Sequence, residues 1–474
     1  MRILTPDICV IGGGSAGLSV AAGAAAFGVS VVLVEKGLMG GDCLNYGCVP
    51  SKALLASAKR AAHMRDAGAF GIAAVEPRVD FGKVNRHVRE VIASIAPNDS
   101  VERFTALGVT VIEAQARFRS RRVVVAGDAE IRARRFVIAT GSSPMVPSIP
   151  GLDGVPYLTN ETVFSVTRKP RRLIVVGGGP IGLEMAQAHR RLGCQVAVVE
   201  AERMLAREDE DLARVVLRRL EAEGVELHEK TKVVSVEAKG KAGVRVHVET
   251  ARGREAIEGT HLLVAAGRRP NTGGLDLERA GVRHGRAGIR VSPTLRTSNR
   301  RIYAIGDVAG GPQFTHVASY HAGLVLRSIL FRLRAKEDRR IIPRATYTDP
   351  EIAAVGLSEA EALAAHRGAR ILRWPLSEND RAQAERATEG FIKVIADRRG
   401  RILGAAIVGA NAGELIGIWA LAVEKGMGVR DMTGYVAPYP TLGEIGKRAS
   451  VSYFAAAAAR PIVRRIVRFL RLFG

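Results

Sequence analysis

The chain has 474 residues, of which 47% are hydrophobic and 25% are charged, and its formal net charge is +23. This length is too great for one hydrophobic core and predicts several globular domains. Four cysteines are too few for the disulfide framework of a secreted protein, so we expect a cytoplasmic chain in which a close cysteine pair is catalytic or metal-binding. The arginine excess is typical of a high-GC coding bias. Because no nucleic-acid motif accompanies it, we expect no nucleic-acid partner.

Residues 8–34 contain no charged side chain, and such a run is long enough to span a bilayer. The run is rich in Gly and Ala, however, and four glycines stand near its start, at positions 12, 13, 14 and 17. A buried strand, a glycine turn and a packed helix explain this composition better than a membrane span does. No signal peptide with a cleavage site is recognisable.

Two stretches of the chain, residues 9–35 and 174–200, repeat one pattern. Each has a β-branched run, a G-x-G-x-x-G turn, an Ala-rich segment and a second β-branched run that ends in Glu, 23 positions after the first glycine. This is the dinucleotide-binding fingerprint, in which the turn and the helix N-terminus face the pyrophosphate and the terminal acid accepts hydrogen bonds from a ribose. The predicted cofactor-binding residues are Gly12, Gly14, Gly17 and Glu35 in the first copy and Gly177, Gly179, Gly182 and Glu200 in the second.

Two dinucleotide sites in one chain predict a flavin and a nicotinamide nucleotide. Residues 136–144 and 262–271 read as strands that end in small residues and glycine, and each is expected to close one nucleotide domain. Residues 301–310 read as a strand that ends at Asp307, whose carboxylate can hold a ribityl hydroxyl of FAD. These segments add Thr140, Gly141 and Asp307 to the predicted FAD site and Gly267 to the predicted NAD(P)H site.

The segment GGDCLNYGCVPSK, residues 40–52, contains a close pair, Cys43 and Cys48. A zinc site usually needs four close ligands, and the other two cysteines lie inside the repeats, so we predict no metal site. A structural disulfide across four residues would constrain little chain and would open in a reducing cytosol. A redox-active disulfide at the start of a helix is the remaining interpretation, because a helix N-terminus lowers the pKa of a thiol.

The fingerprints, the C-x-N-x-G-C-V-P-S-K segment, the A-T-G segment and the G-D segment occur in one order through nearly the whole chain. In this the sequence resembles the pyridine nucleotide–disulfide oxidoreductases, a family that includes dihydrolipoyl dehydrogenase, glutathione reductase and mercuric reductase. The resemblance implies an α/β fold with two Rossmann-like dinucleotide-binding domains and a C-terminal α+β dimerisation domain. The implied FAD domain comprises residues 1–150 and 271–340, the NAD(P)H domain residues 151–270, and the homodimer-forming domain residues 341–459.

The resemblance also implies roles for the residues of the redox segment. Cys48 is expected to lie against the flavin as the charge-transfer thiolate, while Cys43 faces outward and exchanges with the substrate. Lys52 is expected to bind beside flavin N5 and to pair with Glu184, so that the charged pair tunes the flavin. NADH is the expected nicotinamide because Glu200 would repel a 2′-phosphate, but Arg203 and Arg207 keep NADPH as an alternative.

The sequence departs from most thiol reductases of the family near its C-terminus. They carry H-P-T-x-x-E, whose histidine shuttles a proton and is held by the glutamate, whereas this chain has Tyr439 and Glu444 in YPTLGE. A phenol with a pKa of ~10 is a poor base near neutrality. Mercuric reductases resemble the chain here, because they also have tyrosine, but their C-terminal cysteine pair is missing. His316 and His321 are alternative acid–base groups, although lining a helix near the flavin suits them better.

Residues 460–474 form a basic tail in which apolar residues recur at helical spacing and arginines occupy the other side. Such a helix is typical of peripheral binding to an anionic membrane, here the inner face. Packing of the apolar stripe on the dimer is the alternative.

We therefore expect a homodimeric FAD enzyme that passes electrons from NAD(P)H through FAD to Cys43 and Cys48, and on to a disulfide, metal or quinone acceptor. Two alternatives remain at this stage. One is a membrane-associated NADH:quinone oxidoreductase in which the cysteines are secondary. The other is a non-enzymatic flavoprotein redox sensor.

Overall fold

Both glycine-turn repeats fold as a parallel strand–turn–helix–strand unit in the computed structural model, which describes residues 2–240, 243–458 and 460–473. In the first repeat, β2 (Ile8–Ile11) and β3 (Val31–Glu35) are joined by α1 (Ser15–Ala26), and in the second, β10 (Arg172–Val176) and β11 (Gln195–Val199) are joined by α6 (Pro180–Arg191). Ile8 pairs with Val31, and Ile174 pairs with Ala197. The predicted repeat is thus a repeat of structure.

The last glycine of each fingerprint allows the helix to touch the turn. A Cβ on Gly17 would lie 1.8 Å from the carbonyl oxygen of Gly12, and a Cβ on Gly182 would lie 1.9 Å from that of Gly177. Backbone oxygens cannot yield at such distances, so any side chain here would push the helix off the strand.

Contacts between Cα atoms divide the chain into two units, residues 2–203 with 228–337 and residues 204–227 with 338–473. The first unit holds both dinucleotide-binding regions. Its first region is built on a five-stranded parallel sheet with buried residues on both faces, as the alternation of Ile8 and Val10 with Cys9 and Ile11 shows. The strands of this sheet are, in order, β20 (Ile302–Ala304), β8 (Arg135–Ile138), β2, β3 and β4 (Val109–Glu113).

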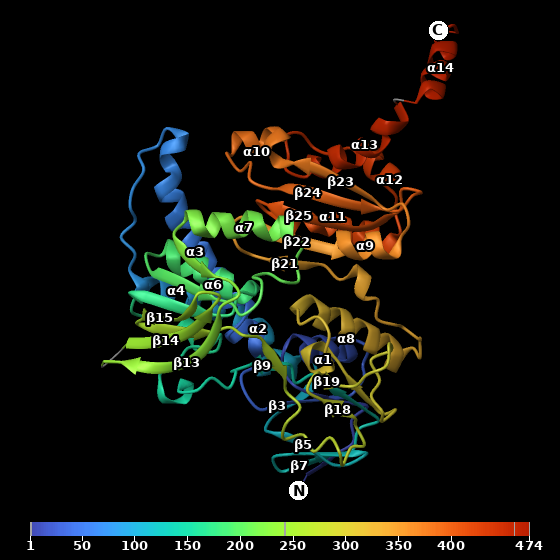
Figure 1. Cartoon of the computed structure of the whole chain (residues 1–474). Coiled ribbons are helices and arrows are strands. Elements are labelled where there is room, and N and C mark those ends of the chain that lie inside the picture. Colours follow the sequence, from blue (N-terminus) through green and yellow to red (C-terminus); the bar gives the residue numbers. More distant parts are fainter. Residues whose placement is uncertain (1, 241–242, 459, 474) are drawn as a thin grey trace. The chain divides into compact units, whose positions relative to one another are not determined.

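Helix α1 packs on this sheet and lies side by side with α8 (Thr315–Leu330), as Figure 1 shows, and α5 (Val101–Ala106) packs on β4. The other helices of this region are α2 (Gly41–Asn45), α3 (Cys48–Asp66) and α4 (Phe81–Ile95), and α3 packs on α4 and on α6. Smaller sheets are formed by β1 (Arg2–Leu4), β7 (Ala129–Ile131), β6 (Val123–Ala126) and β5 (Ala116–Ser120), and by β18 (His284–Gly285) with β19 (Gly288–Ile289).

The second dinucleotide-binding region contains a parallel sheet and a three-stranded antiparallel sheet. Two antiparallel strands, β9 (Ser142–Pro144) and β17 (Arg268–Pro270), are where the chain leaves the first region and returns to it. The remaining strands are β16 (His261–Val264), β12 (Val225–His228), β13 (Lys232–Lys239), β14 (Gly243–Thr250) and β15 (Gly253–Gly259).

The second unit is built on an antiparallel five-stranded sheet that α11 and α13 cover (Figure 1). The sheet order is β21 (Arg344–Thr346), β22 (Glu351–Gly356), β25 (Ile402–Gly409), β24 (Phe391–Ala396) and β23 (Arg370–Pro375). The helices are α7 (Glu210–Ala222), α9 (Glu359–Ala365), α10 (Asp380–Ala384), α11 (Ala412–Lys425), α12 (Val429–Gly434), α13 (Glu444–Ala458) and α14 (Pro461–Leu470).

A buried cation joins α7 to the sheet of this unit. The Lys393 side chain on β24 is only 1% exposed, and its Nζ lies 2.8 Å from Asp209, 2.9 Å from Asp211 and 2.7 Å from Glu359. Arg373 adds ion pairs to Asp211 and Glu359. A buried charge needs such partners, so the network fixes the start of α7 to the sheet.

Candidate active site

The two fingerprint acids lie against their own glycine turns. Glu35 accepts hydrogen bonds from the amides of Gly13 (2.5 Å) and Gly37 (2.7 Å). Glu200 accepts them from Gly178 (2.7 Å) and Glu202 (3.1 Å). Both carboxylates therefore lie at the end of the second strand, beside the turn, where the fingerprint places the ribose.

Space over the helix starts fits a dinucleotide. A Cβ on Gly179 would meet no atom within 4 Å, and a Cβ on Gly14 would meet only the Cα of Gly41, at 3.7 Å. No side chain occupies the space at Gly14 or at Gly179, so each glycine turn forms an open cradle, and the N-termini of α1 and α6 follow directly. The residues present therefore fit a pyrophosphate at each turn.

The predicted FAD-side residues of the first region are held together by hydrogen bonds. The Thr140 hydroxyl donates to the backbone carbonyl of Asn271 (2.7 Å), and the backbone N–H of Asn271 donates to the carbonyl of Gly141 (2.9 Å). Asp307 accepts a hydrogen bond from the Ser142 hydroxyl (2.6 Å), and burial raises the pKa of its carboxyl. Gly267, predicted for the nicotinamide site, directly precedes β17.

The redox segment docks on the first glycine turn through its backbone. The Gly40 amide donates to the carbonyl of Gly13 (2.9 Å), and a Cβ on Gly41 would lie 2.7 Å from the Cα of Gly14. Only glycine at position 41 permits this approach, which holds α2 beside the turn. The GGD start of the segment thus holds α2 beside the glycine turn, a role that the sequence pattern alone did not reveal.

Cys43 lies on α2, and Cys48 is the first residue of α3, as the sequence predicted for a cysteine at a helix start. Both are free thiols in this structure. Cys48 is exposed, and its Sγ lies 3.4 Å from the Thr315 hydroxyl at the start of α8.

The two thiols share their proton unequally. The hydrogen bond with Cys43 lowers the pKa of Cys48 to about 6, against the effect of partial desolvation by the surrounding chain, and the Thr315 hydroxyl and the Lys52 charge lower it further. The same hydrogen bond, together with burial, raises the pKa of Cys43. These pKa shifts favour the thiolate on Cys48 and the thiol on Cys43.

Lys52 and Glu184 are brought together from two helices. The Lys52 Nζ lies 2.8 Å from Glu184 Oε2, and the Glu184 side chain is 6% exposed while that of Lys52 is 39% exposed. Lys52 stands one helical turn after Cys48 on α3, whereas Glu184 is on α6 of the second dinucleotide region. The pair links the helix of the redox segment to the helix of the second fingerprint.

The two histidines after Asp307 differ in their surroundings. His321 is buried, its Nδ1 accepts from the Gly306 amide (3.2 Å), and its Nε2 lies 3.0 Å from Glu337. Both ring nitrogens are engaged, which suits a structural role. His316 is exposed and stacks on Phe314.

Tyr439 and Glu444 lie in the second unit, whereas the cysteine pair lies in the first. The Tyr439 hydroxyl donates to Asp380 Oδ2 (2.9 Å), and this bond, with the Asp380 charge, raises the pKa of the phenol. Glu444 is the first residue of α13, and its charge raises the pKa of Tyr439 further. The phenol is thus held protonated and can donate a hydrogen bond but not accept a proton.

Sequence reasoning missed four neighbours of the predicted site residues: Thr315 beside Cys48, Asp380 beside Tyr439, and Asn160 and Arg268, which both contact Asp42 directly before Cys43. Thr315 is a hydroxyl at a helix start, and Arg268 is an arginine after a glycine. Both patterns are common in proteins, so neither identifies a site residue unless its distant partner is known. Asp380 belongs to a polar segment, residues 378–385, for which the sequence suggested no chemistry.

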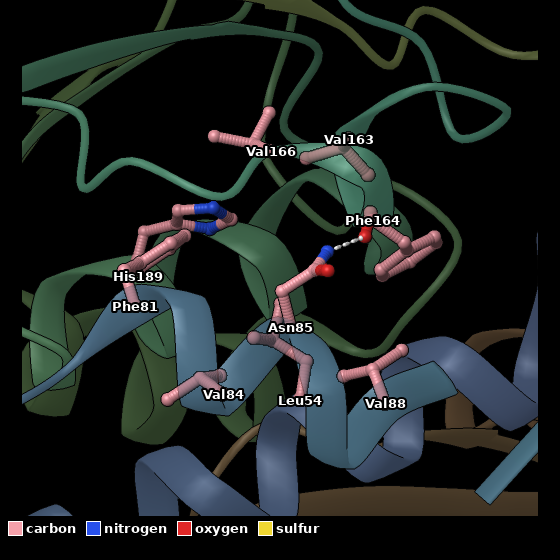
Figure 2. Close-up of a pocket in the computed structure, with 9 residues that line it drawn as sticks. All are labelled: Leu54, Phe81, Val84, Asn85, Val88, Val163, Phe164, Val166 and His189. Carbon is pink, nitrogen blue, oxygen red and sulfur yellow. Dashed lines mark hydrogen bonds between the residues drawn. The ribbon is translucent and has the colours of Figure 1, made fainter. Parts of the chain in front are cut away.

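A small apolar cavity lies away from these residues, between α3, α4, α6 and the turn at 163–166 (Figure 2). Asn85 donates to the carbonyl of Phe164 (2.5 Å) across it, and the His189 ring faces that of Phe81. Burial lowers the pKa of His189 to about 4, so the ring is neutral. These contacts fasten α4 to α6 and do not involve the predicted cofactor residues.

Two kinds of feature are absent from the described part of the chain. Among these residues, no group of three or more His, Cys, Asp or Glu side chains is arranged to hold a metal ion. Within the same residues, no helix combines the length and the apolar character that a bilayer crossing requires.

Comparisons with known proteins agree with this geometry. The family model "Pyridine nucleotide-disulphide oxidoreductase" matches residues 6–322, and the dimerisation domain of the same family matches residues 342–450. A mercuric reductase of Lysinibacillus sphaericus is 35% identical over 450 residues, which cover 94% of this chain and 82% of that protein. A dihydrolipoyl dehydrogenase of Bacillus subtilis is 35% identical over 460 residues, which cover 95% of this chain and 99% of that protein.

A solved structure is also similar, the Cu(II) complex of the HOCl-induced flavoprotein disulfide reductase RclA from Escherichia coli. It superposes with a TM-score of 0.84 at 27% identity and covers 93% of this chain and 98% of its own.

Two glycine cradles, a dithiol and a dimerisation domain define a flavoprotein that couples a nicotinamide nucleotide to a dithiol. The chain belongs to the pyridine nucleotide–disulfide oxidoreductase family. Its use of FAD and NAD(P)H, its enzymatic class and its α/β fold are thereby confirmed, and the sensor alternative gives way to the enzyme. The dimerisation domain supports a homodimer.

Proposed function

We propose that Cys43 and Cys48 are the redox-active pair of this enzyme and that they pass two electrons from NAD(P)H to a small disulfide or a soft metal ion. The observation that carries this proposal is the Cys48 thiol. It is the first residue of α3, it is exposed, its Sγ lies 3.4 Å from the Thr315 hydroxyl, and its pKa is lowered by Cys43, Thr315 and Lys52. A thiolate maintained at neutral pH is what dithiol exchange requires.

FAD, when bound, takes two electrons from NAD(P)H and supplies two electrons to the disulfide. Cleavage of the Cys43–Cys48 bond leaves a thiolate on Cys48 and, after uptake of one proton, a thiol on Cys43. Once deprotonated, Cys43 attacks a substrate disulfide and releases the first substrate thiolate, which takes up that proton. Cys48 then attacks the Cys43 sulfur, re-forms the enzyme disulfide and releases the second substrate thiolate, so that two electrons have moved.

Soft metal ions are the second acceptor class, for two reasons. Thiolates favour soft metals, and Tyr439 stands where a disulfide reductase is expected to have a proton-accepting histidine. A metal acceptor does not need that histidine, because no leaving thiolate must be protonated. The mercuric reductase relatives and the Cu(II) complex of RclA support this class.

The preferred nicotinamide is NADH. The Glu200 carboxylate lies beside the second glycine turn, bonded to the Gly178 amide, where it would repel a 2′-phosphate. NADPH is the alternative because Arg203 and Arg207 follow closely in sequence. We further propose that Tyr439 and Glu444, in the dimerisation domain, complete the site of the second subunit of a homodimer.

Anaerobic titration of the purified holoenzyme with NADH tests the role of the cysteines. We expect a long-wavelength charge-transfer band after two electrons, because the Cys48 thiolate then faces oxidised flavin. Cys43→Ser should abolish steady-state reduction of disulfides and metal ions while flavin reduction by NADH persists. Unchanged turnover of Cys43→Ser with the acceptor that the wild type reduces fastest would show that the flavin passes electrons directly, as in the quinone alternative.

The C-terminal helix carries a second proposal, peripheral binding to an anionic membrane. α14 has no buried residue, and seven apolar side chains of the tail are between 51% and 77% exposed. Residues 460–473 contain five arginines and no acid, and Arg464, Arg465 and Arg468 share one side of the helix. The charge favours an anionic lipid surface over a second copy of this basic chain, and ten residues are too short to span a bilayer. The apolar residues in question are Ile462, Ile466, Val467, Phe469, Leu470, Leu472 and Phe473.

Sedimentation with vesicles tests the membrane proposal. The full chain should bind phosphatidylglycerol vesicles and not phosphatidylcholine vesicles, and removal of residues 460–474 should abolish binding. The triple variant R464Q/R465Q/R468Q, which keeps the apolar side, should lose most of it at physiological salt. Equal binding by the full and truncated chains would refute the proposal, and a change of molar mass on truncation would indicate the dimer-packing alternative.

A further inference from the structure

We propose that Asp42, Asn160 and Arg268 form a redox clamp that fixes the dithiol segment to the two connections between the dinucleotide-binding regions. Arg268 is the positioning residue of this clamp. The inference rests on the proposed redox role of Cys43 and Cys48 and concerns what holds that pair in place and sets its charge.

The clamp acts on the residue directly before Cys43. Asp42 Oδ2 lies 3.0 Å from Arg268 Nη2, and Asp42 Oδ1 accepts a hydrogen bond from Asn160 Nδ2 (3.1 Å). The same Asn160 nitrogen lies 3.2 Å from the carbonyl of Tyr46, which accepts from it. Asp42 and Tyr46 are one helical turn apart, so the Asn160 side chain donates hydrogen bonds at both ends of α2.

Arg268 is itself fixed on its other side. Its Nε donates to the Ser142 hydroxyl (2.8 Å), its Nη2 donates to the Ser142 carbonyl (2.8 Å), and its side chain is only 13% exposed. Since the Ser142 hydroxyl donates in turn to Asp307 (2.6 Å), Arg268 also orients the predicted ribityl-binding carboxylate. The guanidinium fork thus joins Asp42 to both crossing strands, β9 and β17.

The clamp also neutralises a charge beside the thiolate. The groups that act on Cys48 are Cys43 and Asp42 on α2, Lys52 on α3 and the Thr315 hydroxyl on α8, and Asp42 alone among these side chains opposes the thiolate by its charge. Arg268 places a full positive charge on the same carboxylate. Loss of Arg268 should therefore disfavour the Cys48 thiolate, whereas loss of the Asp42 charge should favour it.

A comparison of charge-neutralising variants tests the clamp in FAD-loaded protein. The pH at which the charge-transfer band of the two-electron-reduced protein is half-developed should rise by about half a pH unit in Arg268→Gln and fall by about as much in Asp42→Asn. The double variant should lie near the wild type, and Arg268→Lys should restore part of the Arg268→Gln shift. The pH dependence of iodoacetamide alkylation of the dithiol gives a second readout that does not depend on turnover.

Controls separate the clamp from general damage. Arg269→Gln removes the exposed neighbour on the same strand, and Asp128→Asn removes an exposed turn acid, so neither should shift the midpoint. If Arg268→Gln fails to bind FAD, Asp42→Asn decides, because Arg268 keeps its bonds to Ser142 in that variant. A midpoint of Asp42→Asn equal to the wild type would overturn the clamp, whereas absence of the band in the wild type would overturn the proposed function instead.

Discussion

The Nζ of Lys52 lies 2.8 Å from Oε2 of Glu184, and this ion pair joins the helix that begins at Cys48 to the helix of the second fingerprint. Glu184 is nearly buried, so Glu184→Gln leaves a lysine with a weakened partner beside the proposed flavin site. We expect the rate of flavin reduction by NADH to fall on the order of tenfold, about 1.4 kcal/mol in barrier. Stopped-flow absorbance of the flavin measures this rate.

Glu76→Gln is the matched control for this variant. Glu76 pairs with Arg65 at 2.7 Å on the exposed end of the same helix α3. Wild-type rates in Glu76→Gln with slow rates in Glu184→Gln are expected. Equal rates in both variants would contradict a role for the Lys52–Glu184 pair in electron entry.

Thr315 should set the pH range in which the dithiol is active. The pKa of Cys48 is lowered to about 6, so the thiolate is present above that pH and is lost as the pH falls through it. Thr315→Val removes a hydroxyl that lowers this pKa, and the midpoint of the charge-transfer band should therefore move upward, by about half a unit or more. Thr315→Ser retains the hydroxyl and should titrate like the wild type.

Glu200 should determine the choice of nicotinamide. Glu200→Ala removes the carboxylate that would repel a 2′-phosphate, so the ratio of kcat/KM for NADPH to that for NADH should rise by about tenfold or more. Steady-state kinetics with both nucleotides measure the ratio. Glu202→Ala is the control, since its amide, which donates to Glu200, is retained. An unchanged ratio in Glu200→Ala would show that another residue makes the selection.

Replacing Tyr439 by histidine should favour disulfides as acceptors. The phenol is held protonated by Asp380, whereas an imidazole of unperturbed pKa ~6.5 can accept a proton near neutrality. We expect kcat for lipoamide or glutathione disulfide to rise on the order of tenfold, with little change for soft metal ions. Tyr439→Phe serves as the control for loss of the hydroxyl. A disulfide rate in Tyr439→His no higher than in Tyr439→Phe would mean that Tyr439 does not occupy the proton-transfer position.

Lys393 should be among the residues most important for the stability of the second unit. Lys393→Met leaves Asp209, Asp211 and Glu359 close together without their shared cation, although Arg373 still pairs with Asp211 and Glu359. Breaking a buried ion pair in this way costs about 3 to 5 kcal/mol. Thermal or denaturant unfolding measures the loss, and Lys425→Met, on the exposed end of α11, should cost little. Similar stabilities for the two variants would refute this assignment.

The sequence was sufficient for features that short-range spacing encodes. The fingerprint glycines are required by contacts within their own turns, such as that of Gly17 with the Gly12 carbonyl, so their pattern predicts both turns. Likewise, the residues of the redox segment itself were enough to predict that Cys48 stands at the start of a helix. Thr315 could not be predicted, because its partner Cys48 is 267 residues away and only the packing of α8 brings them together. The same holds for Arg268 with Asp42, and for Asp380 with Tyr439.

Helix α7 has a consequence for attempts to recombine this enzyme with its relatives. It lies between the strands β11 and β12 in the chain, yet it folds with the second unit through Lys393 and a buried apolar face that includes Leu212, Val216 and Leu220. A chimera cut at residue 337 or 338 would carry α7 from one parent and its receiving sheet from the other. Exchange of the C-terminal unit within this family is therefore best attempted with residues 204–227 transplanted together with it.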